Sequence, residues 1–404
     1  MENSKFVAFH RPSVGRLEIE EVVAALESGW LTTGPRTVRF EREFREYVQA
    51  PYSLAVNSCT AAMHLALAAL GIGPGDEVIT SPLTFCATVN CIIHVGATPV
   101  LADIGADGNI DPQSIADRVT DRTRAVMPVH FGGLPCDLNA IWEIARSKNL
   151  YVIEDAAHAV GAHYDGYPIG GGNPRLGYAS DAVAFSFYAT KNLTTGEGGM
   201  LTSTREAMME KARVLCLHGI SKDAWNRYTE KGSWFYEVVE SGFKYNLTDI
   251  QSALGIAQLQ QQEEFVKART AYANFYTEQF AGLEELETPP DSPLSRHAWH
   301  LYPLRLNLDK LTISRAEFIE ELRKKGIGAS VHFIPIPKHG FFSRYASLPQ
   351  NQCPRALELY PRLVSLPLYP AMSWAEVETV VAAVQSIARE HRAATVMPVA
   401  SGAF

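Results

Sequence analysis

The feature that most constrains the fold is a regular alternation of short apolar runs with helical patterns between residues 53 and 203. Seven runs have the length and composition of β-strands, and stretches with apolar residues at helical spacing lie between several of them. The predicted strands cover residues 53–57, 77–81, 98–103, 124–130, 150–155, 181–187 and 199–203, and the predicted helices include 60–70, 84–96 and 137–149. This order predicts an α/β fold with a mostly parallel seven-stranded sheet that is covered by helices on both faces.

The pattern changes near residue 250. Residues 250–282 have apolar positions at helical spacing and no proline, which predicts one long helix joining a large domain to a smaller one. The last third has its own predicted strands within 297–306 and 328–334, and predicted helices at 314–326 and 374–390. We therefore expect a large domain at 12–260 and a small α+β domain at 261–395. The Gly-rich, polar segment 164–180 is predicted to be an exposed loop.

Composition excludes several classes of protein. The 404 residues carry a net charge of -8 without a block of basic residues, which argues against a nucleic-acid or anionic-membrane surface. The N-terminus lacks the apolar core of a signal peptide, and no stretch approaches the ~20 apolar residues of a membrane span. The six cysteines are scattered and form no C-x-x-C pair, so we expect no metal site and reduced thiols in the cytoplasm.

Small hydroxylated residues follow the first predicted strand. Ser58, Cys59 and Thr60 open an Ala/Leu-rich helix, where free backbone N–H groups and the helix dipole can bind a phosphate. The alternative is a plain helix cap, in which a hydroxyl satisfies the first turn. Taken alone, this segment favours the cap.

Two later strands end in reactive groups. The strand 150–155 ends in Glu154 and Asp155, and His158 follows; an acid at that edge of a parallel sheet can hold a cationic ring nitrogen or a metal. The alternative, of equal weight, is that Asp155 caps a turn and His158 is a hydrogen-bonded core histidine. Lys191 follows the strand 181–187 and precedes a Gly- and Thr-rich turn. A partly desolvated lysine can lose its proton and attack a carbonyl carbon, although most lysines are simply solvated.

Together these segments supply what pyridoxal 5'-phosphate (PLP) needs. They offer a phosphate cradle near Ser58, an aromatic ring at Phe85, an acid at Asp155, a hydroxyl at Ser186 and an amine at Lys191. Lys191 would form an imine with the cofactor, Asp155 would keep the pyridine nitrogen protonated, and no metal is required. A nicotinamide enzyme is excluded because the G-x-G-x-x-G fingerprint is missing.

The order and the residue sequences of the motifs resemble those of the DegT/DnrJ/EryC1/StrS sugar aminotransferases, which have the fold-type I aminotransferase architecture. The resemblance extends from about residue 8 to 385 and is nearest to the 4-keto-sugar nucleotide aminotransferases, such as those that make UDP-4-amino sugars. The segments that carry it include "ESGWLTTGPR" (27–36), "AVNSCTAAMHLAL" (55–67), "VIEDAAHAVGAHY" (152–164), "FSFYATKNLTTGEGGML" (185–201) and "GFKYNLTDIQSALGIAQL" (242–259).

The resemblance implies a role for each matching residue. Lys191 matches the Schiff-base lysine, which also moves a proton as a general base, and Asp155 matches the partner of the ring nitrogen. The other implied cofactor contacts are His158 beside the ring, Phe85 stacked on it, and Ser58, Cys59, Thr60, Ala61 and Ser186 at the phosphate. Asn246 matches a residue that the second subunit gives to this site, which implies a homodimer with a shared active site.

The resemblance also implies a substrate class. Trp30, Thr32 and His332 match positions that contact the sugar nucleotide, and Tyr188 replaces a common histidine at a position expected to influence substrate choice. The implied reaction transfers an amino group from L-glutamate to a nucleotide-linked keto-sugar, giving an amino sugar for a cell-surface glycan or a secondary metabolite. One alternative is a sugar dehydratase of the same fold, but that branch has histidine at the position of Lys191. Another is a non-catalytic regulatory protein, which the complete set of site residues disfavours.

Overall fold

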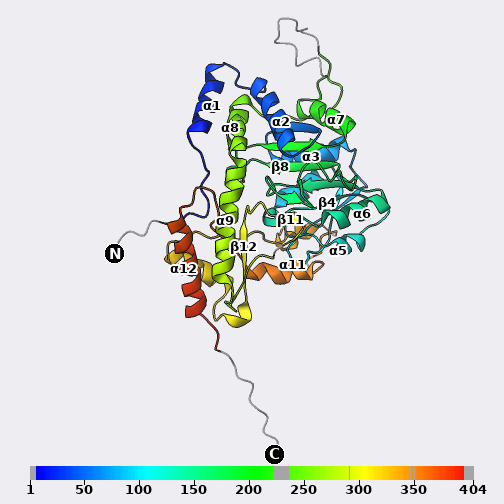
Figure 1. The fold of residues 1–404 in the computed structure, drawn as a ribbon. Coiled ribbons are helices and arrows are strands. Elements are labelled where there is room, and N and C mark those ends of the chain that lie inside the picture. The colour runs from blue at the N-terminus through cyan, green and yellow to red at the C-terminus, as the bar shows by residue number, and fades with distance from the viewer. Residues whose placement is uncertain (1–5, 222–235, 291, 346, 350, 395–404) are drawn as a thin grey trace, which may run out of the picture.

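A seven-stranded sheet forms the centre of the computed structural model, which describes residues 6–221, 236–290, 292–345, 347–349 and 351–394 (Figure 1). The strand order is β1-β9-β8-β5-β4-β2-β3. These strands are β1 (Tyr52–Val56), β2 (Glu77–Thr80), β3 (Thr98–Leu101), β4 (Thr123–Met127), β5 (Tyr151–Asp155), β8 (Ala182–Ser186) and β9 (Gly199–Ser203). Only β9 runs antiparallel to its neighbours in this sheet, so the predicted mostly parallel seven-stranded sheet is confirmed.

Side chains of the sheet alternate between two buried faces. In β8, Val183 and Phe185 pack with α2 and α6, whereas Ala182 and Ala184 pack with α3, α4 and α7. The helices are α2 (Pro35–Tyr47), α3 (Cys59–Ala69), α4 (Cys86–His94), α5 (Pro112–Ala116), α6 (Leu138–Lys148) and α7 (Glu206–Cys216). Because both faces are covered, the parallel strands can be apolar throughout, which is why they were readable as uniform apolar runs.

The predicted single helix 250–282 is wrong in one respect, because the structure divides it at Gln261 into two helices. α8 (Asp249–Gln260) packs beside α1 (Arg16–Glu27) and sends Ile256 into the core of the large sheet. α9 (Gln262–Phe280) sends Tyr276 and Phe280 into a second core. The two halves therefore bury their apolar faces against different parts of the protein. In Figure 1, α8 lies beside α1, and α9 lies near β12 and α12.

The second core surrounds a small antiparallel sheet with the order β10-β12-β13. Its elements are β10 (Leu286–Glu287), β12 (Tyr302–Leu306), β13 (Leu363–Leu366), α10 (Arg315–Lys324) and α12 (Trp374–Glu390), with α11 (Pro354–Leu359) outside it. The predicted strand 328–334 is wrong: Ser330 makes a single bridge to Ser365. Pro335 and Pro337 follow and cannot donate backbone hydrogen bonds to extend a ladder. The domain boundary at 260/261 stays a prediction.

The prediction that segment 164–180 is an exposed loop is only partly right, because much of the segment is buried or half-buried. β6 (His163–Tyr164) pairs with β7 (Tyr167–Pro168) and with β11 (Ser295–Arg296), and Ile169 is buried in the large core. Gly171 lies so close to Gln49 that a Cβ there would be 2.2 Å from the carbonyl oxygen of Gln49. Glycine thus lets this segment pack directly on the backbone after α2. Within the described ranges, no helix is long and apolar enough to cross a membrane.

Candidate active site

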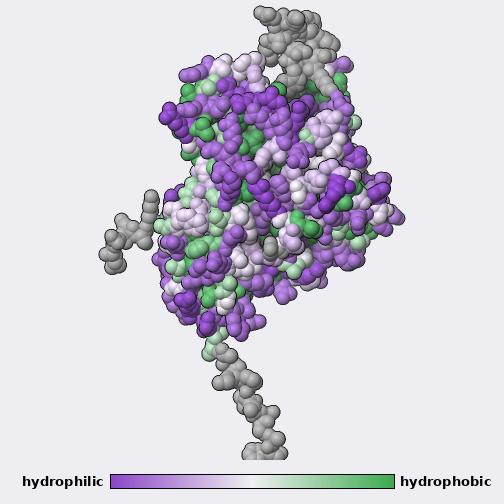
Figure 2. Space-filling model, in the orientation of Figure 1, coloured by the Kyte–Doolittle hydropathy of each residue, from purple (hydrophilic) through white to green (hydrophobic). Residues whose placement is uncertain are grey.

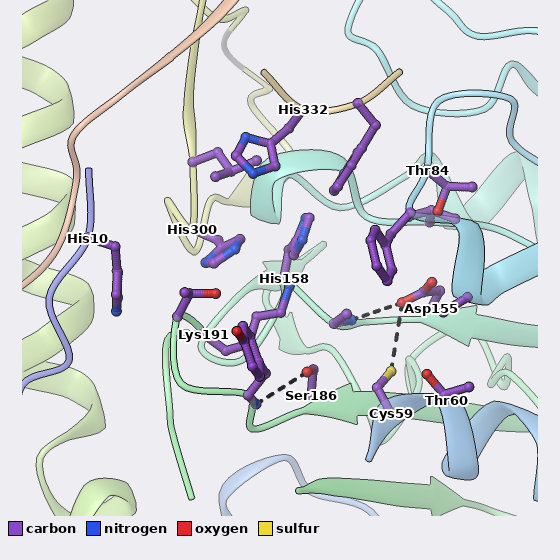
Figure 3. Close-up of a pocket in the computed structure, with 18 of the residues that line it drawn as sticks. His10, Cys59, Thr60, Thr84, Asp155, His158, Ser186, Lys191, His300 and His332 are labelled. Atoms are coloured by element: carbon purple, nitrogen blue, oxygen red, sulfur yellow. Dashed lines mark hydrogen bonds between the residues drawn. The ribbon is translucent and has the colours of Figure 1, made fainter. Parts of the chain in front are cut away.

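One cavity of about 580 Å³ lies where the carboxyl ends of β5 and β8 meet the start of α3 (Figure 3). Segments far apart in the sequence form its walls, from Phe9 near the N-terminus to Leu368 after β13. Phe85 and Tyr188 line it and are largely exposed, so they stand at its open rim. The position agrees with the rule that parallel α/β sheets place ligands beyond the carboxyl ends of their strands.

Lys191 is held by a tight turn after β8. Its backbone N–H donates to the Tyr188 carbonyl at 2.9 Å, and burial lowers the pKa of its amine to about 8. The next residue, Asn192, fixes the turn against distant chain: its amide nitrogen donates to the Ala298 carbonyl at 2.8 Å, and its amide oxygen lies 3.1 Å from His300 Nδ1. Lys191 is therefore a desolvated amine on an anchored loop, and the solvated-lysine alternative is not what the structure shows.

Asp155 ends β5 with its side chain directed into the cavity (Figure 3). Its Oδ2 accepts a hydrogen bond from the Thr88 hydroxyl at 2.8 Å, and its Oδ1 accepts one from the Ala157 N–H at 3.2 Å. Burial raises the pKa of the carboxyl, and these hydrogen bonds oppose that rise. The hydrogen bond from Ala157 is the turn cap of the alternative interpretation. Asp155 also accepts a hydrogen bond from Thr88 and faces the cavity, and capping a turn requires neither.

The start of α3 forms another wall. The Ser58 hydroxyl accepts the Ala61 N–H at 3.0 Å, so the predicted helix cap is real. The N–H groups of Cys59 and Thr60 have no hydrogen-bond partner in the described chain and belong to the first turn, where an anion is favoured. Gly199 lies against this turn: a Cβ there would be 2.6 Å from the Ser58 carbonyl carbon. The cap and the phosphate cradle are thus compatible.

Four histidines complete the lining. Burial lowers the pKa of His158 and His300 well below the usual value, and lowers that of His332 and His10 to about 4. The His158 and His300 rings lie 4.3 Å apart between centroids, and the His158 ring stacks on Phe333. His158 Nδ1 is buried without a partner in the described residues, so the hydrogen-bonded core histidine of the alternative is wrong. Neutral imidazoles can accept hydrogen bonds where protonated ones cannot.

Most of the predicted site residues meet in this cavity. Those that line it are Ser58, Cys59, Thr60, Phe85, Asp155, His158, Ser186, Tyr188, Lys191 and His332. Ala61 is buried one residue further into α3 and does not line it. The sequence missed Phe9, His10, Thr84, Glu197 and His300 as lining residues. Glu197 stood in the polar turn after Lys191 and His300 in the segment "HAWHLY", but nothing local marked either side chain as part of a site.

Three predicted residues lie together away from the cavity. Asn246 donates from its amide to the Thr33 hydroxyl at 2.7 Å, beside Thr32, whose carbonyl accepts the Asp249 N–H. Trp30 is exposed at the end of the same turn. Asn246 precedes α8 but does not cap it, because Thr248 does. These residues form a second cluster, the 30–33/246 cluster, on the surface of the chain.

The cavity can support a defined kind of chemistry. The first turn of α3 could hold a phosphate, Asp155 could hold a protonated ring nitrogen, and Lys191 could bond to a carbonyl carbon. Across the described residues, no group of three or more His, Cys, Asp or Glu is placed to hold a metal ion.

Comparison with known proteins gives the family. Residues 12–385 match the DegT/DnrJ/EryC1/StrS aminotransferase family. The spore coat polysaccharide biosynthesis protein SpsC of Bacillus subtilis is 49% identical over 390 residues, which are 96% of this chain and 98% of SpsC.

Solved structures show the same fold. Spr1654 of Streptococcus pneumoniae, named as a candidate sugar aminotransferase and solved in PMP and PLP forms, superposes with TM-scores of 0.88 and 0.87 at 32% identity, covering 95% of this chain and 99% of Spr1654. PseC of Helicobacter pylori, an aminotransferase in pseudoaminic acid biosynthesis, superposes with a TM-score of 0.87 at 28% identity, covering 96% of this chain and all of PseC. The predicted fold-type I architecture and PLP cofactor agree with these structures. The chain therefore belongs to the DegT/DnrJ/EryC1/StrS aminotransferase family, a family of PLP-dependent sugar aminotransferases.

Proposed function

We propose that this chain transfers an amino group from L-glutamate to the C4 keto group of a nucleotide-linked sugar. The observation that carries the proposal is the placement of Lys191, Asp155 and the first turn of α3 around one cavity. Three separate segments thus supply the amine, the acid and the phosphate cradle that PLP chemistry requires.

The cavity fits PLP in three respects. The unpaired N–H groups of Cys59 and Thr60 suit a phosphate. The buried carboxylate of Asp155 suits a protonated ring nitrogen, because a cation beside a buried acid favours its charged form. His158 Nδ1 is a buried polar atom without a partner in the described chain, and a ligand with a polar substituent would satisfy it.

The chain's own residues then have defined tasks. When bound, PLP supplies an aldehyde carbon and an electron-withdrawing ring. Lys191 Nζ, with its pKa lowered to about 8, has a larger neutral fraction near pH 7 than an ordinary lysine, so it can act as a nucleophile and as a base. Lys191 Nζ would take the proton from the α-carbon of the amino donor, and Asp155 would keep the ring nitrogen protonated.

Two features support a sugar substrate. SpsC takes part in spore coat polysaccharide biosynthesis and PseC in pseudoaminic acid biosynthesis, and both names concern sugar metabolism. In the pocket, the neutral rings of His300 and His332 can accept hydrogen bonds from hydroxyl groups. We assign contacts with the sugar nucleotide to His332, Tyr188, Trp30 and Thr32, and the product is an amino sugar for a cell-surface glycan or a secondary metabolite.

We propose further that the enzyme is a homodimer with shared active sites. The 30–33/246 cluster lies outside its own cavity, and Asn246 would reach the phosphate in the partner's site. Exposed apolar side chains on α1 and after it, Ile19, Val23, Leu26 and Leu31, could be buried by a second copy. In Figure 2, hydrophobic residues are scattered among hydrophilic ones at this end of the protein. We place the enzyme in the cytoplasm, because all six cysteines are free thiols.

The test combines purified protein, PLP, L-glutamate and a panel of nucleotide-linked 3-keto- and 4-keto-sugars. Mass spectrometry should show replacement of one keto oxygen by an amino group, together with formation of 2-oxoglutarate. Loss of a hydroxyl from the sugar without incorporation of nitrogen would instead identify a dehydratase. Failure to bind PLP would overturn the proposal, and use of only another amino donor would overturn its glutamate part.

A further inference from the structure

A chain of two hydroxyl groups leads from the buried wall of the cavity to Asp155. Thr84 Oγ1 lies 2.7 Å from Thr88 Oγ1, and Thr88 Oγ1 lies 2.8 Å from Asp155 Oδ2. Thr88 is in the first turn of α4, and Thr84 lines the cavity (Figure 3). Both threonines are buried. Neither residue belongs to the set that the sequence singled out.

The chemistry of the groups fixes the direction of this chain. A hydroxyl has one hydrogen to donate, and a carboxylate can only accept. Thr88 can donate to Thr84 Oγ1 at 2.7 Å, to Asp155 Oδ2 at 2.8 Å or to the Phe85 carbonyl at 3.1 Å, and the ionised carboxylate is the strongest acceptor of the three. Thr88 therefore donates to Asp155, which leaves Thr84 to donate to Thr88. The order Thr84 to Thr88 to Asp155 is consistent only while Asp155 Oδ2 carries no proton.

The surroundings give Asp155 few other stabilising contacts. Its Oδ1 receives the Ala157 N–H at 3.2 Å and lies 3.9 Å from the Cys59 thiol, a long contact to a weak donor. The titratable groups that influence it are Cys59 from α3, Cys91 from α4, His130 after β4 and Lys191 after β8. Within the described residues, Thr88 is thus the one hydroxyl that binds this buried carboxylate.

We propose that Thr88, oriented by Thr84, is a positioning residue that holds Asp155 as a carboxylate directed toward the ring nitrogen of PLP. The inference rests on the proposed function, because it needs PLP in the cavity. Burial disfavours the charged form of Asp155, and the Thr88 hydrogen bond opposes burial. Without it, the proton shared between acid and ring nitrogen moves toward Asp155, and the ring withdraws electrons less strongly.

The test uses PLP labelled with ¹⁵N in its ring. The matched variants are Thr88→Val, which keeps the shape and removes the hydroxyl, and Thr88→Ser, which keeps the hydroxyl. In Thr88→Val, the ¹⁵N resonance should move from the protonated toward the unprotonated position, and PLP should bind roughly tenfold more weakly, as expected for one hydrogen bond to a charged group. Thr88→Ser should restore both values, and Thr84→Val should move them in the same direction by a smaller amount.

The outcomes separate this inference from the proposed function. If the wild-type protein binds no PLP, the proposed function fails. If the wild-type protein binds PLP with a protonated ring nitrogen and Thr88→Val gives the same resonance and affinity, the role of Thr88 is refuted. If Thr88→Val does not fold, Thr84→Val decides: an unchanged resonance in that folded variant refutes the chain of hydroxyls, and a shifted one supports it.

Discussion

Replacement of Gly199 by alanine tests how closely the sheet supports the phosphate cradle. Gly199 is the first residue of β9 and lies directly against the start of α3. A Cβ at this position would be 2.6 Å from the Ser58 carbonyl carbon, 2.7 Å from the Cys59 nitrogen and 2.7 Å from the Phe185 carbonyl oxygen. All three are backbone atoms, so no side-chain rotation can relieve the contact.

The size of the effect follows from this geometry. Ordinary contacts of a Cβ begin at 3.4 Å, so the overlap with Ser58 is 3.4 minus 2.6, or 0.8 Å. Inserting one carbon into a packed interior costs about 1–3 kcal/mol. If α3 moves away to relieve the strain, its first-turn N–H groups leave the phosphate position. We therefore expect PLP affinity to fall roughly tenfold to a hundredfold, since each 1.4 kcal/mol is about a factor of ten.

The assay is titration of the apoprotein with PLP, followed by absorbance, together with thermal unfolding with and without PLP. The matched control is Gly340→Ala, because a Cβ at Gly340 meets nothing within 4 Å and its φ is not positive. Gly340→Ala should match the wild-type protein in both measurements. Wild-type PLP affinity and an unchanged melting temperature in Gly199→Ala would refute the reasoning that β9 sets the position of α3.

Three further predictions concern Lys191, Asp249 and the proposed dimer. Because burial lowers the pKa of the free Lys191 amine to about 8 and the neutral amine is the nucleophile, the rate at which the apoprotein forms an imine with PLP should rise with pH and level off above about 8; a flat rate between pH 7 and 9 would contradict this. Asp249→Asn should lower the free energy of unfolding by about 2–4 kcal/mol. The buried carboxylate accepts hydrogen bonds from the N–H groups of Gly34, Arg36 and Thr37, and the single oxygen of an amide cannot accept all three. An unchanged midpoint in urea denaturation would contradict this prediction. Co-expression of the Lys191→Ala and Asn246→Ala variants should recover roughly a quarter of wild-type activity, because half of the dimers are mixed and each mixed dimer has one intact site of two. If each site were built from one protomer alone, co-expression would recover no activity.

The sequence predicted the framework of the site because the relevant strands are buried on both faces. Apolar runs marked β5 and β8, so Asp155 at the end of β5 and Lys191 after β8 could be placed at one edge of a parallel sheet by topology alone. The start of α3 could be predicted in the same way, because it directly follows the apolar run of β1. Where a local pattern and the global fold agree, the position of a side chain follows from the sequence.

The rest depends on packing between distant segments. His300 enters the cavity because Asn192, 108 positions earlier in the chain, binds its ring, and no periodicity reports such a contact. Thr84 and Thr88 look like ordinary helix-start threonines until Asp155 is seen beside them. The break at Gln261 was missed because α8 and α9 share one helical pattern while they face two different cores. The hydrophobic pattern of the sequence predicts the helices and strands, whereas their relative positions depend on tertiary contacts.

The anchoring of Asn192 has a practical consequence for engineering. A fragment that ends near residue 290 would retain the seven-stranded sheet, the start of α3, Asp155 and Lys191 itself. It would lose the Ala298 carbonyl and the His300 ring, which hold Asn192 beside Lys191. Grafting the lysine loop onto another scaffold would therefore transfer Lys191 without the contacts that orient its loop, so a minimal version of this protein must also include residues 298–300.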